Sequence, residues 1–586
     1  MHKIVRYFLG CLFYTLLHAQ ELMLPTHAIH FVGQKHFDKA TLEDALSIDN
    51  KNFLEFWKRD NPRIKDALLP TLGASIKSFY RSEGFYDMQA HIKETNTTVT
   101  VYIKENKPVR VNKIEIQSDY NLSSFIGMKK NDIFRAKSFI LSKKKTIEAL
   151  LDEGYCSYDL NCKAYVDLEK HKVDLKYRLK KGDICTFGKL SLSGLNGINN
   201  DVIVSRIRAR EGEKFSIKKV QETSNNLYGL GIFDSVVIDV DRKFYNVVPV
   251  DIHFHQKEKP YHLEAGAGYD SYVGPRIHTE ITKYNFLGNA QKLNFQASWS
   301  KLEQSLILHY EKPAFWNLFG YNLDFGARIG YSNLEFDGFR EEKSFSRVYV
   351  LHENAKLSLK IGMALESIHI TALDNLNEGQ ELEQAVNEGS FVLAYPYVDF
   401  IYDARDSKLN PKYGYYLAGY TEIGLSRDKD ESVYQKTQIE VRMIHTFSDL
   451  TLAVVSKAGV IDSKSEKGLP ESKYFFGGGA YSNRAYGFRE MGIIASPTQD
   501  TIYGASSMAN LSLEADYPIS ENVYGALFND NTMLTDRAYH FKGDIISSAG
   551  VGVRYMTPIG PFKLDVGFNV HKPAIYGISF QIGQSF

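Results

Sequence analysis

The arginine with the most unusual surroundings is Arg484, in the segment FFGGGAYSNRAYGFRE at residues 475–490. Four glycines and five aromatic rings accompany it in that segment. A guanidinium is always charged and can donate two parallel hydrogen bonds to one carboxylate, a geometry that lysine lacks. Glycines would let such a loop fold back closely. The chemistry open to this segment is therefore an ion pair that fixes a loop; the alternative is a solvated arginine on a surface loop.

The patterns that mark catalysis do not occur in the sequence. It has no G-x-S-x-G nucleophile turn, no H-E-x-x-H zinc motif and no phosphate-binding loop. The seventeen histidines are scattered without ligand spacing, and HFH at 253–255 fits strand alternation better than a metal site. We therefore expect no enzymatic activity, no catalytic residue, no cofactor and no metal site.

The cysteines leave two alternatives open. Cys156, Cys162 and Cys185 follow the N-terminal leader. In an oxidising compartment Cys156 and Cys162 could close a small loop within GYCSYDLNCKAY. Free thiols are the alternative, and metal binding is disfavoured because no histidine or cysteine cluster completes a site.

The leader, MHKIVRYFLGCLFYTLLHAQ, combines basic residues with an apolar run that ends near Ala19. This arrangement is typical of a secretory signal peptide, which we place at residues 1–19. No later stretch reaches the ~18 apolar residues of a membrane-spanning helix. The 70 basic and 70 acidic residues balance, so nothing indicates a nucleic-acid partner.

A helix-period segment followed by a glycine and a strand occurs three times between residues 22 and 258. The glycines are Gly84 in SFYRSEGFYDMQAHI, Gly154 in EALLDEGYCSYDLN and Gly231 in NNLYGLGIFDSVVIDV. A glycine suits the left-handed position at a helix end. We predict three α+β modules of order β-α-α-β-β. An open sheet edge, near AIHFVG in the first module, could accept a strand of another chain, or the modules could be spacers.

From about Tyr261 onward the helical period gives way to alternation with period two. In GPFKLDVGFNV, for example, Leu564 and Val566 alternate with Lys563 and Asp565. One apolar and one polar face, repeated over roughly 320 residues behind a leader, is the signature of a transmembrane β-barrel. The alternating segments number about sixteen.

Together the two halves resemble the BamA/TamA superfamily of outer-membrane assembly barrels. RIRAREGEKFSIKKVQETSNNLYGLGIFDSV is similar to a membrane-proximal POTRA module, YDARDSKLNPKYGYYL to a mid-barrel pattern, and GPFKLDVGF to the penultimate strand. The resemblance implies α+β POTRA modules at 22–107, 108–182 and 183–258, and a sixteen-stranded antiparallel barrel at 261–586. It also implies a loop folded into the barrel at about 461–500.

The segment NRAYGF resembles the core of that inward loop, which usually reads Val/Ile-Arg-Gly-Phe/Tyr. Arg484 falls on the loop arginine and Tyr486 on the aromatic residue. The resemblance implies that the arginine reaches carboxylates of the barrel wall. The matching wall motifs are NLSLEADYPI, which gives Glu514, and ALFNDN, which gives Asp530. We expect these groups to pin the loop and brace the wall.

Three residues depart from the usual pattern of the superfamily. Asn483 and Ala485 flank the arginine in place of the usual residue types, and Thr532 stands where glycine is usual. Alternation places Glu514 on the polar face, which is the expected lumen. It does not settle the face of Asp530, because both faces of that strand are mixed.

The resemblance also implies a weak lateral seam where the first strand, HLEAGAGYDS, meets the last, YGISFQIGQSF. Glycines reduce side-chain packing at such a seam. The seam residues expected here are Gly266, Gly268, Gly577, Gly583 and Phe586.

Three repeats fit the TamA-like branch of the superfamily. That branch implies an outer-membrane barrel with periplasmic modules, a TamB-like inner-membrane partner, and unfolded outer-membrane proteins such as autotransporters as clients. It further implies contact with the lipid bilayer and a role in phospholipid transport. The alternatives are a BamA-like general insertase and a two-partner secretion pore.

Overall fold

The computed structural model describes residues 26–46, 48, 62–240, 246–270, 274–319, 321–335, 339–372, 388–427, 431–465, 468–496, 499–520, 522–557 and 560–582. The signal peptide expected at 1–19 lies outside these residues, as do Gly583 and Phe586 of the expected seam.

The first module is built on a four-stranded sheet of order β2-β1-β4-β3. Its elements are β1 (Thr26–Val32), α2 (Lys39–Ala45), β2 (Arg63–Lys65), the 3₁₀ turn η1 (Asp66–Leu68), α3 (Leu69–Ser82), β3 (Gln89–Glu94) and β4 (Thr98–Lys104). Alternate residues of β4, Val99, Val101 and Ile103, face the core. Leu72 and Ile76 of α3 cover them, because their spacing of four places both on one helix face.

The position of β1 corrects one expectation. Its residues Ala28–Val32 pair with β4 on one side, and Thr26–Ala28 pair with the short β2 on the other. The edges of the first sheet are therefore β2 and β3, and not the strand at AIHFVG.

The second module contains β5 (Arg110–Ser118), α4 (Ala136–Asp152), β6 (Asp159–Asp167) and β7 (Lys172–Lys180), in a sheet of order β5-β7-β6. Residues 119–135 form turns where the repeat pattern predicts a first helix. This module therefore has the order β-α-β-β. Its long connection is held partly by its own side chains, since Ser118 Oγ donates to the backbone of Tyr120.

The third module has both helices: β8 (Thr186–Ser193), α5 (Asn200–Val204), α6 (Ile217–Gly229), β9 (Phe233–Val240) and β10 (Val247–Gln256), with sheet order β8-β10-β9. Gly84, Gly154 and Gly231 all have positive φ angles, of 98°, 84° and 73°, which confirms the left-handed positions predicted at these glycines. Among the described residues, no helix is both long and apolar enough to cross a membrane.

The cysteine pairing differs from the predicted one. Cys156 forms a disulfide with Cys185, with the two Cα atoms 5.9 Å apart, and Cys162 is a free, half-buried thiol. Cys162 lies in β6 and packs on the core of the second module. Cys156 follows α4, where the backbone N–H of Cys185 donates to the carbonyl of Gly154. Cys162, the nearer cysteine in the sequence, lies in β6 and away from Cys156, whereas the backbone contact with Gly154 places the distant Cys185 next to Cys156.

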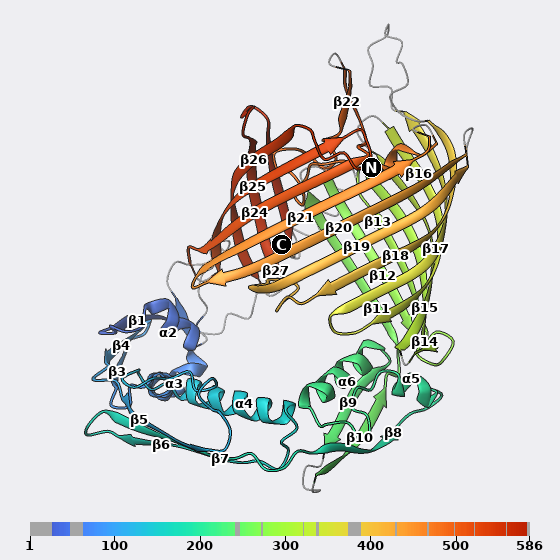
Figure 1. Cartoon of the computed structure of the whole chain (residues 1–586). Coiled ribbons are helices and arrows are strands. Elements are labelled where there is room, and N and C mark those ends of the chain that lie inside the picture. The colour runs from blue at the N-terminus through green and yellow to red at the C-terminus, as the bar shows by residue number, and fades with distance from the viewer. Residues whose placement is uncertain are drawn as a thin grey trace. The chain divides into compact units, whose positions relative to one another are not determined.

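The C-terminal half forms one sheet of sixteen antiparallel strands in chain order, which confirms the predicted barrel architecture (Figure 1). The strands are β11 (Tyr261–Asp270), β12 (Gly274–Tyr284), β13 (Lys292–Trp299), β14 (Glu303–Leu318), β15 (Tyr321–Glu335), β16 (Phe339–Glu353), β17 (Leu357–Ala372), β18 (Gly389–Asp403), β19 (Tyr413–Arg427), β20 (Ser432–Phe447), β21 (Leu450–Ser463), β24 (Ser507–Pro518), β25 (Val523–Thr535), β26 (Ile545–Thr557), β27 (Gly560–Asn569) and β28 (Tyr576–Ile582).

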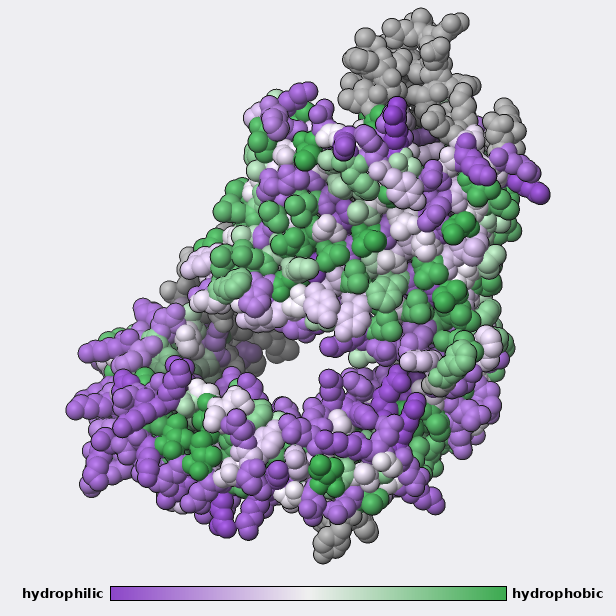
Figure 2. Space-filling view, in the orientation of Figure 1, coloured by the Kyte–Doolittle hydropathy of each residue, from purple (hydrophilic) through white to green (hydrophobic). Residues whose placement is uncertain are grey.

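The two faces of the barrel sheet carry different side chains, as the alternation predicts. In β27, Leu564 and Phe568 are exposed on the outer face, whereas Lys563 and Asp565 are buried on the inner one. Figure 2 shows apolar residues gathered on the outside of the barrel. This is the arrangement that a lipid-facing sheet requires.

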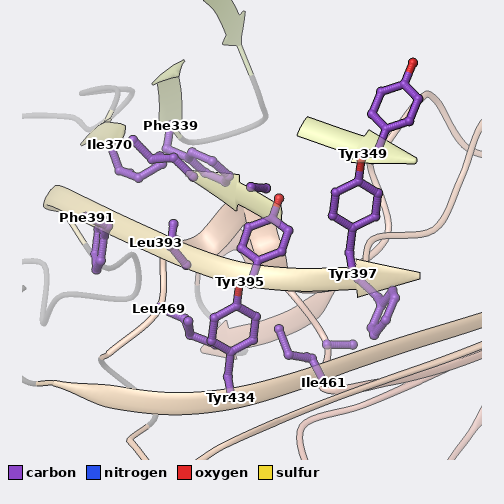
Figure 3. Packing of buried hydrophobic residues seen from close by; sticks show 14 of the residues in the cluster. Phe339, Tyr349, Ile370, Phe391, Leu393, Tyr395, Tyr397, Tyr434, Ile461 and Leu469 are labelled. Carbon is purple, nitrogen blue, oxygen red and sulfur yellow. The ribbon is translucent and has the colours of Figure 1, made fainter. Parts of the chain in front are cut away.

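The inner face is not polar everywhere. On β16, β17, β18 and β20 it carries a buried apolar cluster that includes Phe339, Ile370, Leu393, Tyr395 and Tyr434 (Figure 3). Leu469, Phe475 and Ala505, from the segment between β21 and β24, complete this cluster. The wall is apolar there because a loop of the chain covers it in place of water.

Candidate functional site

The segment between β21 and β24 lies against the inner wall of the barrel. It contains the 3₁₀ turn η2 (Glu471–Lys473) and a small hairpin of β22 (Ile493–Ser496) and β23 (Gln499–Tyr503). Gly478 and Gly479 have φ angles of 91° and 89°, and a Cβ atom on Gly478 would lie 2.2 Å from the carbonyl oxygen of Gly487. The glycines therefore allow the tight folding back of this inward loop.

Arg484 lies at the centre of the loop's contact with the wall and is only 4% exposed. Its Nε and Nη2 atoms donate to the two carboxylate oxygens of Asp530 at 2.9 Å each, and its backbone N–H donates to Asp530 at 3.0 Å. Its Nη1 donates to Glu514 at 2.5 Å. The structure thus brings the predicted arginine together with both predicted carboxylates, in a forked geometry.

The face of Asp530, which alternation leaves open, follows from the same contacts. Phe528 and Asp530 both point inward on β25, while Leu527 is 64% exposed on the outside. The Arg484 guanidinium lies 3.5 Å from the centre of the Phe528 ring. The inner face of β25 is mixed because one arginine uses an aromatic face and a carboxylate of the same strand.

Further charged residues surround this pair, and the sequence interpretation did not assign them to the site. Arg554 on β26 donates to Glu514 at 2.8 Å and to Asp565 on β27, and Arg484 Nη1 also donates to Asp565 at 3.4 Å. Lys563 lies 3.9 Å from Glu514. The alternating pattern of β27 does place Lys563 and Asp565 on the polar face, but nothing in it shows that they converge on the loop.

Tyr486 contacts a different part of the wall. Its hydroxyl accepts a hydrogen bond from Asn569 Nδ2, at the end of β27, at 2.7 Å. Its carbonyl accepts from the backbone N–H of Gly479 at 2.9 Å, which closes the loop on itself. Tyr486 therefore holds the loop beside the Arg484 site rather than within it.

Two of the three departures from the family pattern occur at one contact. Asn483 is fully buried, donates to the carbonyl of Ile546 at 3.1 Å, and lies 3.5 Å from Thr532 Oγ1. Asn510 Nδ2 also donates to Thr532, at 2.9 Å. A polar residue in the loop is thus matched by a polar residue where the wall usually has glycine, so this contact remains satisfied although both residues differ.

A glycine of the barrel wall, Gly567, allows the loop backbone to approach closely. A Cβ atom on Gly567 of β27 would lie 2.8 Å from the carbonyl carbon of Arg484 and 3.0 Å from the backbone nitrogen of Ala485. Only a glycine allows the loop backbone to lie directly on this strand.

Of the expected seam residues, Gly266, Gly268 and Gly577 are among the described ones. Gly266 and Gly268 pair with His278 and Arg276 of β12, and Gly577 pairs with Gly567 of β27. β11 and β28 are the two end strands of the sheet, and no hydrogen-bonded register joins them within the described residues. The glycines therefore lie on both sides of an unpaired boundary.

The arrangement is a network of buried ion pairs. Three cations, Arg484, Arg554 and Lys563, are buried with the carboxylates of Glu514, Asp516, Asp530 and Asp565. Buried charges of this kind persist only when they are paired. No group of histidine, cysteine, aspartate or glutamate side chains within the described residues could hold a metal ion.

Comparisons with known proteins match both halves of the chain. The family model of the Omp85 superfamily domain matches residues 285–586, and a POTRA model, described as a surface antigen variable number repeat, matches residues 185–259.

Several relatives bear the name outer membrane protein assembly factor BamA, among them the following two. The one from Nitratidesulfovibrio vulgaris (strain Hildenborough) is 21% identical over 563 residues, which cover 92% of this chain and 69% of the relative. The one from Neisseria meningitidis serogroup B is 20% identical over 638 residues, which cover 95% and 78%. The crystal structure of BamA from Haemophilus ducreyi lacking POTRA domains 1–3 covers 81% of this chain and 99% of its own at 17% identity, with a TM-score of 0.54, and so has a similar fold.

Proposed function

The chain belongs to the Omp85 superfamily, and from that premise we propose that it is an outer-membrane assembly factor that inserts client proteins through the boundary between β11 and β28. The barrel lies in the outer membrane and the POTRA modules lie in the periplasm. The clients are unfolded outer-membrane proteins, including autotransporters, which pass into the bilayer at this boundary.

The observation that carries the proposal is the boundary itself. β11 and β28 end the sheet without a shared register within the described residues, and the described part of β28 spans seven residues. Unpaired N–H and C=O groups on such an edge can template another strand. In lipid they are satisfied only by pairing, so a client strand would be drawn to them.

Two branches of the superfamily fit this proposal. The relatives named BamA favour the general insertase, which we adopt as the main interpretation. The three modules favour the second candidate, a TamA-like factor that works with a TamB-like inner-membrane partner and moves phospholipids. A two-partner secretion pore fits less well, because the inward loop occupies part of the lumen and is held there by buried charges.

Photo-crosslinking in cells tests the proposal. A crosslinking amino acid is placed at Leu263 on β11, and in a matched control at Ile361 on β17; both side chains face outward, with exposures of 68% and 51%. We expect nascent outer-membrane proteins to be captured from position 263 and not from position 361. Equal capture at both positions would contradict insertion at the boundary, and capture of a single secreted protein would indicate the pore.

A second position separates the two branches. Gln89 lies on β3, an exposed edge strand of the first module. Capture of a large protein anchored in the inner membrane from this position would favour the TamA-like branch. Capture of unfolded clients alone would favour the general insertase.

A further inference from the structure

The inward loop contacts the barrel wall at a second group of buried charges, centred on Lys473 in η2. The Lys473 ammonium lies 2.9 Å from Glu422 on β19 and 3.0 Å from Glu366 on β17. It also lies 4.2 Å from the centre of the Tyr395 ring on β18. All four side chains are buried or nearly so. Lys473 is eleven residues from Arg484 in the chain and contacts different strands.

The two carboxylates that receive Lys473 are themselves held by the wall. Glu366 accepts from Arg347 on β16 at 2.8 Å and from the Tyr395 hydroxyl at 2.6 Å. Glu422 accepts from the hydroxyl of Tyr420, its neighbour on β19. The acceptors therefore have fixed positions, and the ammonium enters a site that other residues have already oriented.

The backbone around Lys473 is fixed as well. Lys436 on β20 donates to the Lys473 carbonyl at 2.5 Å, and its ammonium lies 4.8 Å from the centre of the Phe475 ring. Phe475 and Ala505 exchange backbone hydrogen bonds of 2.9 and 2.8 Å, which tie the two legs of the loop together. Glu471 accepts from the backbone N–H of Gly504 in the same place. We call residues 469–476 with 504–505 the loop root.

The loop root also carries apolar side chains, and these alone could keep it on the wall. Leu469, Phe475 and Ala505 belong to the buried cluster of Figure 3, beside Tyr395 and Tyr434. Hydrophobic packing is non-directional, however, and a buried charge is costly unless its partners are in place. A lysine in this cluster therefore fixes the position of the root in a way that an apolar residue does not.

We propose that Lys473, with Glu366 and Glu422, is the positioning residue of the inward loop: it holds the loop root on β17 and β19 independently of Arg484. When the contacts of Arg484 with β24, β25 and β27 break, the root stays in place and only the tip, residues 477–491, is released. The inference concerns the loop and does not depend on the proposed function, so its test uses no client protein.

Hydrogen exchange of the purified full-length protein in a membrane mimetic tests this division. The exchange of the root is followed at the hydrogen-bonded backbone amides of Lys473, Tyr474 and Phe475. The exchange of the tip is followed at those of Gly477, Gly479 and Tyr486. In Lys473→Met, a variant of similar length without the charge, we expect root amides to exchange roughly tenfold faster or more. In Arg484→Met we expect the tip amides to exchange faster while the root amides keep their wild-type rates.

Matched variants guard against simple misfolding. Lys360→Met removes a lysine of β17 that is paired with Asp399 at 3.6 Å and does not belong to the inward loop. We expect it to leave the exchange of the loop root unchanged. Glu422→Gln removes one of the two carboxylates that face Lys473 and should accelerate the same root amides by a smaller factor. It serves as the test if Lys473→Met does not fold.

Two outcomes would overturn the proposal. The first is wild-type exchange of the root in both Lys473→Met and Glu422→Gln, which would mean that apolar packing alone positions it. The second is release of the root in Arg484→Met, which would mean that the loop opens as one unit. Faster exchange of the root in the Lys473 and Glu422 variants, with a protected root in the Arg484 variant, supports it.

Discussion

The two sides of the barrel differ in the length of their strands. β14 to β20 have 15 or 16 residues each, whereas β27, β28, β11 and β13 have 10, 7, 10 and 8. At about 3.3 Å per residue, the long strands extend about 50 Å and β28 extends about 23 Å. A tilted strand needs about 9–11 residues to cross a bilayer. The strands on the two sides of the boundary between β11 and β28 are therefore shorter, within the described residues, than those on the opposite side of the barrel.

The inward loop contacts the side with long strands and the side with short strands through different residues. Lys473 in its root contacts β17 and β19 on the long side. Arg484 in its tip contacts β24, β25 and β27, the strands that lead to β28. From this division we expect the pairing of the end strands to change more readily than the contacts of the long side and the loop root.

The largest effect is expected from locking the boundary. Each residue of β11 from Tyr261 to Ala265 is replaced by cysteine in turn and combined with Ile578→Cys on β28. The pair of cysteines that oxidises completely to a disulfide is used. If clients enter between these strands, the oxidised protein loses client assembly entirely and regains it on reduction. The measurement is the yield of folded client in membranes before and after addition of a reductant.

The control for this lock lies on the long side. Val348 of β16 and Met363 of β17 are directly opposite each other and both face outward. The pair Val348→Cys with Met363→Cys should oxidise without loss of assembly. Full activity of the protein locked between β11 and β28 would contradict the proposed function.

The next largest effect is expected at Arg484. Arg484→Ala leaves Asp530 buried without its main partner, and removal of one member of a buried pair costs about 3–5 kcal/mol. Arg484→Lys keeps the charge but loses the fork, so we expect a smaller loss. Thermal unfolding followed by gel mobility measures both. Arg340→Ala, which removes an exposed pair with Glu335, should change stability by about 0.5 kcal/mol or less. A wild-type unfolding temperature for Arg484→Ala would show that the wall does not need the loop.

The parts of the site that the sequence predicts are those that depend on local pattern. Alternation identifies the outer face of β27 and the inward Glu514, and the resemblance identifies Arg484. Alternation of polarity does not identify the inner face of β25, because this face carries both an apolar residue, Phe528, and a charged one, Asp530. Both contact the guanidinium of Arg484. Arg554 and Lys473 are missed because their partners lie on strands far away in the sequence, and no short-range pattern records such a contact. The disulfide partner Cys185 is missed for the same reason.

The two joints between the modules also differ in what holds them. At the joint between the first and second modules, the N–H of Val109 donates to the carbonyl of Gly84 at 2.8 Å. At the joint between the second and third modules, the N–H of Cys185 donates to the carbonyl of Gly154 at 2.8 Å. The second joint also has the disulfide between Cys156 and Cys185. Replacing Cys156 and Cys185 by serine should destabilise the second joint by about 2–4 kcal/mol. Pulse proteolysis of the full-length protein in denaturant measures this loss. Cys162→Ser, which removes only the free thiol, should have no comparable effect, and equal resistance of all three proteins would contradict a structural role for the disulfide.

The smallest effect is expected where the loop tip and the wall differ together from the family pattern. Asn483 and Thr532 are in contact at 3.5 Å, and Asn510 holds Thr532 from the other side at 2.9 Å. Asn483 donates to the Ile546 carbonyl and accepts from the Ser548 hydroxyl. Asn483→Val alone leaves both groups without this partner, at a cost of about 1–3 kcal/mol. Thr532→Gly alone leaves Asn483 and Asn510 underbonded and opens space.

The double variant Asn483→Val with Thr532→Gly restores the usual family residues at both positions. Because a valine fits beside glycine and brings no polar group that needs Thr532, we expect it to be more stable than the sum of the single losses predicts, by about 0.5–1.5 kcal/mol. A double-mutant cycle on thermal unfolding gives this coupling energy. Strict additivity would mean that Asn483 and Thr532 contribute to the contact of the tip with the wall independently of each other.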